Sequence, residues 1–271
     1  MNVNTIGTQR GCIHYQRWGK GKRLLIAFHG FSNQGKLFEP LANALGNEFR
    51  LVAIDLPFHG QTEWRSNSYN KADVKAWIEA ILQREACTTF EWMGFSLGAR
   101  IILSLCREMG NALQGIHLIA PDGLATYRTT LTQIVPVPIR SWLNQAVAAH
   151  PTRWLSRARR LHQLRLLDTF SLKYFEQQFR SPSHIHRLFG TWVSLVHFPV
   201  RAQVVRHWLI QEAIPITICL GHQDKFINVA SIEKWANPIP QKKLGWFNQG
   251  HHLVTAALAQ FYAENLPLKG N

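Results

Sequence analysis

Short apolar, strand-like runs alternate with segments of helical spacing along most of this chain of 271 residues. The helical segments carry apolar residues three and four positions apart. Such alternation is typical of βαβ units, which place helices on both faces of a largely parallel sheet. The strand-like runs lie at 11–18, 23–28, 50–56, 90–95, 115–120, 214–220 and 242–247, and the helical segments between and after them at 34–45, 71–84, 97–109, 229–235 and 253–265.

The alternation stops between residues 124 and 210, where the pattern is helical throughout and prolines punctuate it. No strand-like run is evident in this stretch, and the βα alternation resumes after it. We therefore predict one α/β core domain, formed by residues 1–122 and 212–271, and a helical cap inserted at 123–211. The sheet is expected to be mostly parallel and eight-stranded.

Composition is that of an ordinary globular protein, with 46% hydrophobic and 17% charged residues. The first 22 residues are polar and contain no apolar stretch of the kind found in secretory signals. No apolar run reaches the length of about 20 residues that a membrane-spanning helix needs. The four cysteines are scattered, without a C-x-x-C pair. These features together lead us to expect a cytoplasmic protein.

The formal net charge is +14, and its distribution along the chain is uneven. Residues 123–212 hold 12 of the Lys and Arg but only 3 of the Asp and Glu, a net charge of +9. Such a surface attracts anionic substrates or anionic lipid. The only dense basic run is 157–160, so we do not expect nucleic-acid binding. An anionic substrate and a peripheral membrane contact through the basic cap remain expectations, and the oligomeric state is left open.

The most specific motif is Gly94-Phe95-Ser96-Leu97-Gly98. It stands between the predicted strand 90–95 and the predicted helix that follows, which is the strand–turn–helix setting of a nucleophilic serine. There the serine lies on a tight turn, and its hydroxyl projects near a helix N-terminus, where amide groups favour developing negative charge. Ser96 is therefore the predicted nucleophile.

A serine needs a positioned base, and the base needs a carboxylate that orients it. His251 and His252 follow the last predicted strand, and His251 is favoured because His252 is expected to begin the next helix. Asp224 lies four residues beyond the strand 214–220 and is the favoured acid. Asp122, which follows an earlier strand, is the alternative acid, although it could simply cap its turn with the glycine after it.

The order Ser96, Asp224, His251 resembles that of the α/β-hydrolase fold superfamily, and the likeness to its capped serine hydrolase branch covers nearly the whole chain. His29-Gly30-Phe31 resembles the turn that follows the third strand in that family. The resemblance implies that the backbone N–H groups of Phe31 and Leu97 form the oxyanion hole.

Residues 55–62 (DLPFHGQT) resemble the D-x-P-G-x-G-x-S turn of the same family, with Phe58 in place of a glycine and Thr62 in place of serine. In the family this turn is structural, so the change leaves the predicted triad intact and is expected to alter one wall of the site. Members that dehalogenate alkanes or open epoxides carry aspartate at the nucleophile position. Both activities are therefore disfavoured here.

These observations predict a serine hydrolase, of the carboxylesterase, lipase or thioesterase kind, that cleaves an ester or related acyl bond through an acyl-enzyme. No metal or organic cofactor is expected. The pair His184 and His186 has the spacing of two metal ligands on a strand but lies in a helical context without an acidic third ligand. Two alternatives stay open: an acyltransferase with the same triad, and a hydrolase-like protein that only binds its ligand. Some aromatic residues of the cap are expected to line the pocket, from among Trp142, Trp154, Phe175, Trp192 and Trp208.

Overall fold

The computed structural model describes residues 4–45, 47–124 and 136–265, and these residues contain one nine-stranded sheet of order β1-β2-β4-β3-β6-β7-β8-β9, with β5 paired to β2 outside this path. The six strands from β4 to β9 along this order are parallel, whereas β1, β2 and β5 pair antiparallel. The strands are β1 (Thr5–Thr8), β2 (Gly11–Trp18), β3 (Arg23–Phe28), β4 (Phe49–Ile54), β5 (Glu63–Trp64), β6 (Phe90–Phe95), β7 (Leu113–Ile119), β8 (Ile216–Gly221) and β9 (Lys242–Phe247).

The mostly parallel sheet is confirmed, with one strand more than the eight expected. Two strands have no counterpart among the seven runs found in the sequence: β1, of four residues, and β5, whose two residues are too few to produce a periodic pattern. Strand β5 pairs with Gly11 and Cys12 at the start of β2. Gly11 has a φ of 138°, and a Cβ there would lie 2.0 Å from the carbonyl oxygen of Glu63, so this pairing requires glycine.

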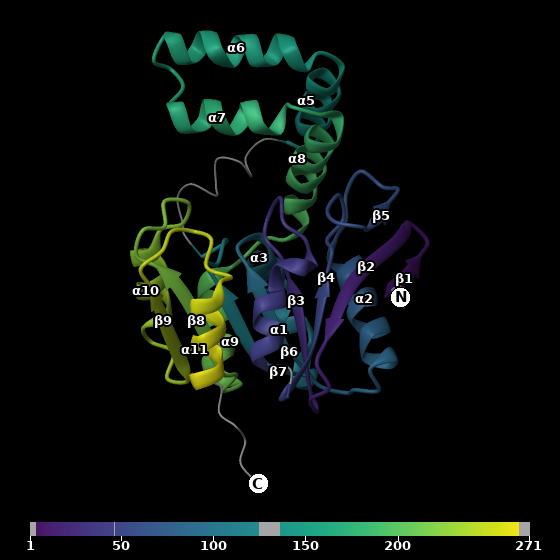
Figure 1. Cartoon of the computed structure of the whole chain (residues 1–271), viewed down its shortest axis with the longest axis vertical. Helices are drawn as coiled ribbons and strands as arrows, with labels where there is room; N and C mark the ends of the chain where they lie inside the picture. Colours follow the sequence, from purple (N-terminus) through teal and green to yellow (C-terminus); the bar gives the residue numbers. More distant parts are fainter. Residues whose placement is uncertain (1–3, 46, 125–135, 266–271) are drawn as a thin grey trace.

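Two layers of helices enclose the sheet (Figure 1). Apolar residues of α1 and α11 pack on one face, and those of α2, α3, α9 and α10 pack on the other. The α-helices are α1 (Glu39–Leu45), α2 (Lys71–Arg84), α3 (Leu97–Leu105), α5 (Val137–Ala149), α6 (Pro151–Gln163), α7 (Thr169–Gln178), α8 (Pro182–Ser194), α9 (Ala202–Gln211), α10 (Val229–Ala236) and α11 (Ala256–Asn265). Short 3-10 turns are η1 (Gly35–Phe38), η2 (Cys106–Glu108), η3 (Gly110–Ala112) and η4 (Leu195–His197).

Helix α2 shows how local sequence sets these boundaries. The side chain of Asn70 accepts hydrogen bonds from the N–H groups of Ala72 and Asp73, and the Asp73 carboxylate accepts one from the N–H of Asn70. This capping box begins the helix at Lys71, as predicted. Val74, Trp77, Ile78 and Ile81 then fall on one face and are buried against the sheet.

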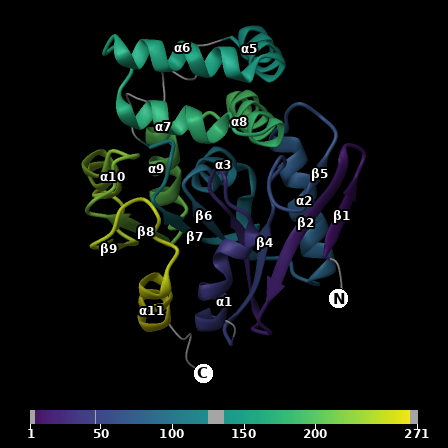
Figure 2. The same cartoon turned by 45° about the horizontal axis from the view of Figure 1, so that its top comes forward.

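Helices α5 to α8, which follow β7, stand above the edge of the sheet where the parallel strands end, and we call them the cap helices (Figures 1 and 2). Helix α6 is the outermost, with α7 between it and the sheet. Helix α9 packs with the core, since Val205 and Leu209 are buried in the cluster beneath β7 and β8. The division into 1–122, 123–211 and 212–271 stays a prediction, and the packing of α9 favours a cap that ends before residue 202.

In the described parts of the chain, no helix is both long enough and apolar enough to traverse a bilayer.

Candidate active site

Ser96 lies at the turn between β6 and α3, with φ 50° and ψ −109°. This is a conformation that non-glycine residues rarely adopt, and such strain is found at functional sites that the surrounding structure holds in place. The N–H of Ser96 donates to Ile119 at 2.9 Å, and its carbonyl accepts from the N–H of Asp122 at 3.3 Å. The end of β7 therefore fixes the turn from the neighbouring strand.

The glycines on either side of Ser96 allow strand and helix to approach closely. A Cβ at Gly94 would lie 2.6 Å from the backbone nitrogen of Ala99, and one at Gly98 would lie 2.0 Å from the carbonyl oxygen of Phe28. Any side chain at these two positions would push α3 away from β6 or β3. The spacing of the motif thus follows from the packing of the turn.

The loops after β8 and β9 are joined by backbone hydrogen bonds. The N–H of His222 donates to Phe247 at 2.9 Å, and the N–H of Gln223 donates to Gln249 at 3.0 Å. These bonds hold Asp224 and His251 next to each other, although 27 residues separate them in the sequence. The His251 loop thereby reaches over the end of β6.

The structure brings Ser96, His251 and Asp224 into one hydrogen-bonded row. His251 Nδ1 lies 2.7 Å from Asp224 Oδ2, and His251 Nε2 lies 2.9 Å from Ser96 Oγ. With the proton on Nδ1, the imidazole donates to the carboxylate and accepts from the serine hydroxyl. The row has the geometry that general-base activation of a serine requires.

The Asp224 side chain is fully buried but has several hydrogen-bond donors. Its Oδ1 accepts from the N–H of Phe226 at 2.8 Å and from that of Ile227 at 3.2 Å. Burial by itself raises the pKa of Asp224, but the hydrogen bond with His251 and those from the two N–H groups outweigh it, and the pKa lies below its ordinary value. Asp224 is therefore a stable anion beside the imidazole.

Neither alternative residue takes part in this row. His252 is exposed, and no hydrogen bond joins its ring to Ser96 or Asp224 within the described structure. It does not begin the last helix as expected, because α11 starts only at Ala256. Asp122 instead forms a paired contact with the buried Arg100, at 2.8 and 3.1 Å.

The backbone N–H groups of Phe31 and Leu97 both lie at the carboxyl edge of the sheet, one after β3 and the other at the first position of α3. Neither donates a hydrogen bond to any residue that the structure describes. The first N–H groups of a helix have no intrahelical acceptor and favour negative charge. Both groups are thus available to an oxygen of a bound substrate.

Two buried histidines support the loop that carries Phe31, a role the sequence did not reveal for His59. His29 Nε2 accepts from the N–H of Leu56 at 3.0 Å, and Nδ1 donates to the carbonyl of Gly30 at 2.7 Å. The His59 ring lies 5.1 Å from that of His29 and meets the Phe31 ring edge-on at 5.7 Å. Burial lowers the pKa of His29 well below its ordinary value and that of His59 to about 4, so both rings are neutral.

Because both histidines are buried and neutral, the stability of the folded protein should depend on pH. The unfolded chain protonates His59 near pH 6.5, whereas the folded chain does so only near its pKa of about 4. Between these values the unfolded state binds more protons, so the free energy of unfolding falls as the pH is lowered from about 6.5 toward 4. Denaturant unfolding at several pH values measures this slope. His59→Gln should flatten it, and an equally steep slope in that variant would contradict the assignment.

The turn at residues 55–62 is held by the carboxylate of Asp55. It accepts from the N–H of Gly35 at 2.5 Å and from that of Gln61 at 2.9 Å. Phe58 adopts a φ of 69°, where glycine is usual, and its ring meets that of His186 edge-on at 5.0 Å. Gly190 on α8 makes room for this ring, since a Cβ there would lie 2.7 Å from it. Phe58 thus connects the core to α8 and is absent from the wall of the cavity at Ser96.

Above Ser96 lies a cavity of about 520 Å³ between the core and the cap helices. Its wall is mainly aromatic and aliphatic, and most of it comes from α7 and α8. Of the five aromatic residues considered from the sequence, Phe175 and Trp192 line it. Trp142 is 60% exposed, and Trp208 packs against the core. The lining residues are Phe31, Ser96, Leu97, Asp122, Ser171, Tyr174, Phe175, Phe179, Leu188, Phe189, Thr191, Trp192 and Leu195.

Arg187 on α8 adds a positive charge near this site. Its Nε is buried and has no hydrogen-bond partner among the described residues. Its charge contributes to lowering the pKa of both His29 and His59, which places it close to the loop of Phe31. Among the residues that the structure describes, no carboxylate lies within ion-pair distance of Arg187, and such a cation is suited to bind an anionic group. His184 and His186 lie on the same helix two positions apart, a spacing at which helical side chains do not face each other.

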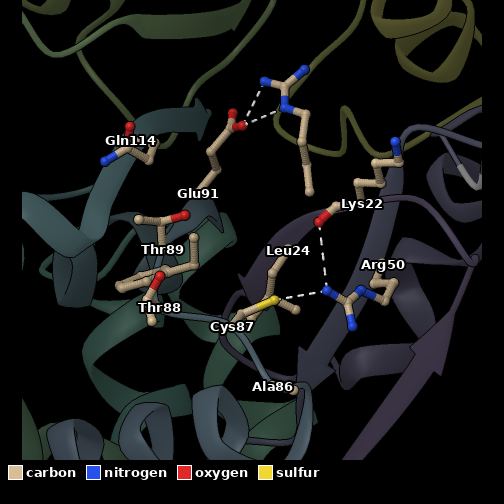
Figure 3. Close-up of a pocket in the computed structure, with 11 residues that line it drawn as sticks. Lys22, Leu24, Arg50, Ala86, Cys87, Thr88, Thr89, Glu91 and Gln114 are labelled. Carbon is tan, nitrogen blue, oxygen red and sulfur yellow. Dashed lines mark hydrogen bonds and ion pairs between the residues drawn. The ribbon is translucent and has the colours of Figure 1, made fainter.

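A second cavity, of about 430 Å³, lies at the opposite edge of the sheet, where β3, β4, β6 and β7 begin (Figure 3). Both of its arginines have hydrogen-bond partners. Arg23 donates to Glu91 at 2.8 Å, and Arg50 donates to the Cys87 sulfur at 2.7 Å and to a carbonyl. The cavity is separated from Ser96 by the length of β6. We assign it no part in the chemistry at Ser96.

The sheet order and the turn at Ser96 define the fold as that of the α/β hydrolases. The model of the alpha/beta hydrolase fold family matches residues 23–255 of this chain. The chain belongs to this family.

Individual relatives match only part of this chain, and their sequence identity is low. The pimeloyl-[acyl-carrier protein] methyl ester esterase of Sodalis glossinidius (strain morsitans) is 27% identical over 108 residues, which cover 40% of each chain. The match thus spans less than half of that relative.

Two solved structures share the architecture over nearly the whole chain. The thioesterase domain from the curacin biosynthetic pathway aligns over 97% of this chain and 98% of its own, with a TM-score of 0.64 and 19% identity. A thermophilic esterase from Thermogutta terrifontis aligns over 97% and 96%, with a TM-score of 0.70 and 14% identity. At these identities the likeness shows the fold.

Proposed function

We propose that the protein hydrolyses an ester or thioester through an acyl-enzyme formed on Ser96. The observation that carries this proposal is the row of hydrogen bonds from the buried Asp224 through His251 to Ser96 Oγ. A serine in a binding site has no need of an oriented imidazole and a buried carboxylate behind it. The row ends below a cavity large enough for an acyl chain.

In the first half of the proposed cycle, Ser96 Oγ attacks the carbonyl carbon of the substrate, and His251 Nε2 takes the hydroxyl proton. The imidazolium that forms donates through Nδ1 to the Asp224 carboxylate, which stabilises its charge. His251 then passes the proton to the leaving alcohol or thiol as the bond between it and the acyl carbon breaks. The acyl group remains on Ser96.

In the second half, a water molecule attacks the acyl-enzyme with His251 again as base, and the acid product leaves as the Ser96 hydroxyl is restored. In both halves the carbonyl oxygen gains negative charge. The N–H groups of Phe31 and Leu97 would stabilise this charge, a contribution of about 3 kcal/mol per donor in comparable sites. Their position at a strand end and a helix N-terminus supports this assignment.

The cavity wall indicates the kind of acyl group. Aromatic and aliphatic side chains of α7 and α8 make up most of it, so an apolar chain gains free energy by leaving water there. We therefore propose an acyl chain of medium length or an aromatic acyl group. The methyl ester of a chain attached to a carrier protein, as in the name of the relative from Sodalis, is one substrate to test.

We further propose that the preferred substrate carries an anionic group, which Arg187, next to the cavity-lining Leu188 on α8, binds. Arg187→Gln is expected to raise the KM for an ester that bears a carboxylate by about tenfold, because a hydrogen bond to a charged group is lost. The KM for a neutral ester of equal length should be unchanged. Steady-state kinetics with the two esters measure the difference, and Arg180→Gln, an exposed position after α7, is the matched control. Equal effects on both esters would contradict this role.

The proposed activity is tested with chromogenic esters and thioesters of increasing acyl length. We expect turnover with an optimum at a chain that fills the cavity, and a shift of this optimum to shorter chains in Leu188→Phe, which narrows it. Addition of an alcohol distinguishes the two transfer reactions. An acyltransferase would form mainly the new ester in dilute alcohol, whereas the proposed hydrolase forms mainly the acid. A folded protein without turnover on any of these compounds would overturn the proposal.

A further inference from the structure

Helix α6 has an inward face and an outward face of different character. Positions 151, 154, 155, 158 and 162 are buried or partly buried and face the other cap helices. The other positions are exposed, and on the side away from the cap they include Arg153, Arg157, Arg160 and Leu164, while Leu161 lies on the flank. Exposed arginine and leucine continue into the turn after the helix. We call these residues the α6 face: Arg153, Arg157, Arg160, Leu161, Leu164, Arg165 and Leu166.

The leucines of the α6 face are unusually accessible for their size. Leu161 is 44% exposed, Leu164 69% and Leu166 73%. Single exposed leucines are common on protein surfaces, but three on one helix end form a patch that requires an explanation. Both views of the fold show α6 as the outermost element, so its outward face points away from the body of the protein (Figures 1 and 2).

The arginines of the α6 face carry uncompensated charge. None of the four has a carboxylate within ion-pair distance among the described residues, whereas Arg159 on the flank of the helix pairs with Glu176 at 3.0 Å. Asp168 is committed to the start of α7, where it accepts from the N–H of Ser171 at 2.9 Å. The field above the α6 face is therefore positive.

Arg165 occupies a position that favours glycine. It follows the end of α6 with a φ of 59°, and the N–H groups of Arg165 and Leu166 donate to His162 and Leu161. This pair of hydrogen bonds is the Schellman motif, in which the left-handed residue is usually glycine. Ala86 and Ala213 end α2 and α9 in the same motif, so the chain tolerates side chains in this conformation. At the end of α6 the motif places an arginine between the exposed Leu164 and Leu166.

We propose that the α6 face docks on an anionic lipid surface. Arginines bind the phosphates of the headgroups, while the leucines enter the boundary with the acyl chains, as on amphipathic helices that lie in a membrane interface. Nucleic acid would neutralise the arginines but offers no apolar phase for the leucines. This docking is independent of the chemistry at Ser96.

Cosedimentation with lipid vesicles tests the proposal on the full chain. The protein should pellet with phosphatidylcholine vesicles that contain about one third phosphatidylglycerol and remain in the supernatant with phosphatidylcholine alone. Ser96→Ala should bind the same vesicles with unchanged affinity. Absence of binding to the anionic vesicles would overturn the proposal, and a mobility shift of single-stranded DNA or binding of polyglutamate would then assign the α6 face to another polyanion.

Two variants separate the contributions of charge and of apolar contact. Arg153→Gln, Arg157→Gln and Arg160→Gln combined should weaken vesicle binding about a hundredfold, since each cation near such a surface contributes about a fivefold factor. Lys20→Gln, Lys22→Gln and Arg65→Gln, exposed positions on the core, remove the same charge and should leave binding nearly unchanged. Leu161→Ser, Leu164→Ser and Leu166→Ser combined should weaken it at least about tenfold. Full binding by the leucine variant would contradict insertion.

The variant Arg165→Gly separates loss of the charge at the lipid surface from loss of the fold. Glycine suits the left-handed backbone at this position, so the variant should unfold at the same temperature as the wild type or higher. It should nevertheless bind anionic vesicles about fivefold more weakly. Unchanged binding in this more stable variant would contradict a role of Arg165 at the lipid surface.

Discussion

Ser96→Ala is expected to lower kcat for ester hydrolysis by about 10⁶-fold, the loss seen when comparable triads are deprived of their nucleophile. The hydroxyl that forms the acyl-enzyme is removed, while the amides of Phe31 and Leu97 and the cavity remain. Because Ser96 is only partly buried, its replacement by alanine should change the packing of the core little. The thermal unfolding temperature should therefore change little, and kcat measured by stopped and continuous assays should give the same loss.

The combined variant Ser96→Ala, His251→Ala provides the control for this prediction. If the two residues act as one unit, the double variant is no slower than either single variant. Losses that multiply would mean that the two side chains act in separate steps. That result would contradict the proposed cycle even if each single loss were large.

Asp224→Asn is expected to lower kcat by about 10⁴-fold. The asparagine can still accept from the N–H groups of Phe226 and Ile227 through its carbonyl oxygen, so the loop keeps its shape. Its amide then faces His251 Nδ1 as a donor, which forces the proton onto Nε2 and removes the acceptor for the Ser96 hydroxyl. Steady-state kinetics beside a crystal structure or hydrogen-exchange map of the variant would separate this effect from local unfolding.

Asp122→Asn is the matched comparison, because Asp122 also lies near Ser96 but bonds Arg100 and not His251. We expect it to reduce stability, since the buried Arg100 loses its charged partner, and to leave most of the kcat of the folded fraction. A larger loss of kcat in Asp122→Asn than in Asp224→Asn would contradict the assignment of the acid.

The core of the fold was accessible to sequence analysis because its signals are local. The turn from β6 to α3 at Ser96 requires glycine where the strand and helix backbones approach closely, and Gly94 and Gly98 occupy those positions. The capping box of Asn70 and Asp73 sets the start of α2 at the predicted residue. The loops that carry Asp224 and His251 follow apolar strands, and parallel strands end at one edge of a sheet. The order of strands and loops along the chain was therefore enough to bring the candidate residues together.

Other features depend on packing between distant segments and left little trace in the sequence. Contacts with α5 and with Phe58 determine which face of α8 points toward the cavity. The sequence therefore suggested Trp192 as a lining residue because it is aromatic, but it held no signal that distinguishes Leu188 from the other leucines of the cap. The strand β5 is too short to show periodicity. His59 supports the loop of Phe31 because its ring is buried against Phe31. The residues around a single histidine in the sequence do not predict whether that histidine is buried.

The central claim is that Ser96 is an activated nucleophile, and a fluorophosphonate ester tests it most directly. Intact-protein mass spectrometry should show one phosphonyl adduct, and peptide mapping should place it on Ser96. Asp224→Asn should react much more slowly, and Ser96→Ala should not react at all. A folded wild-type protein that forms no adduct, or forms it at another residue, would contradict the account.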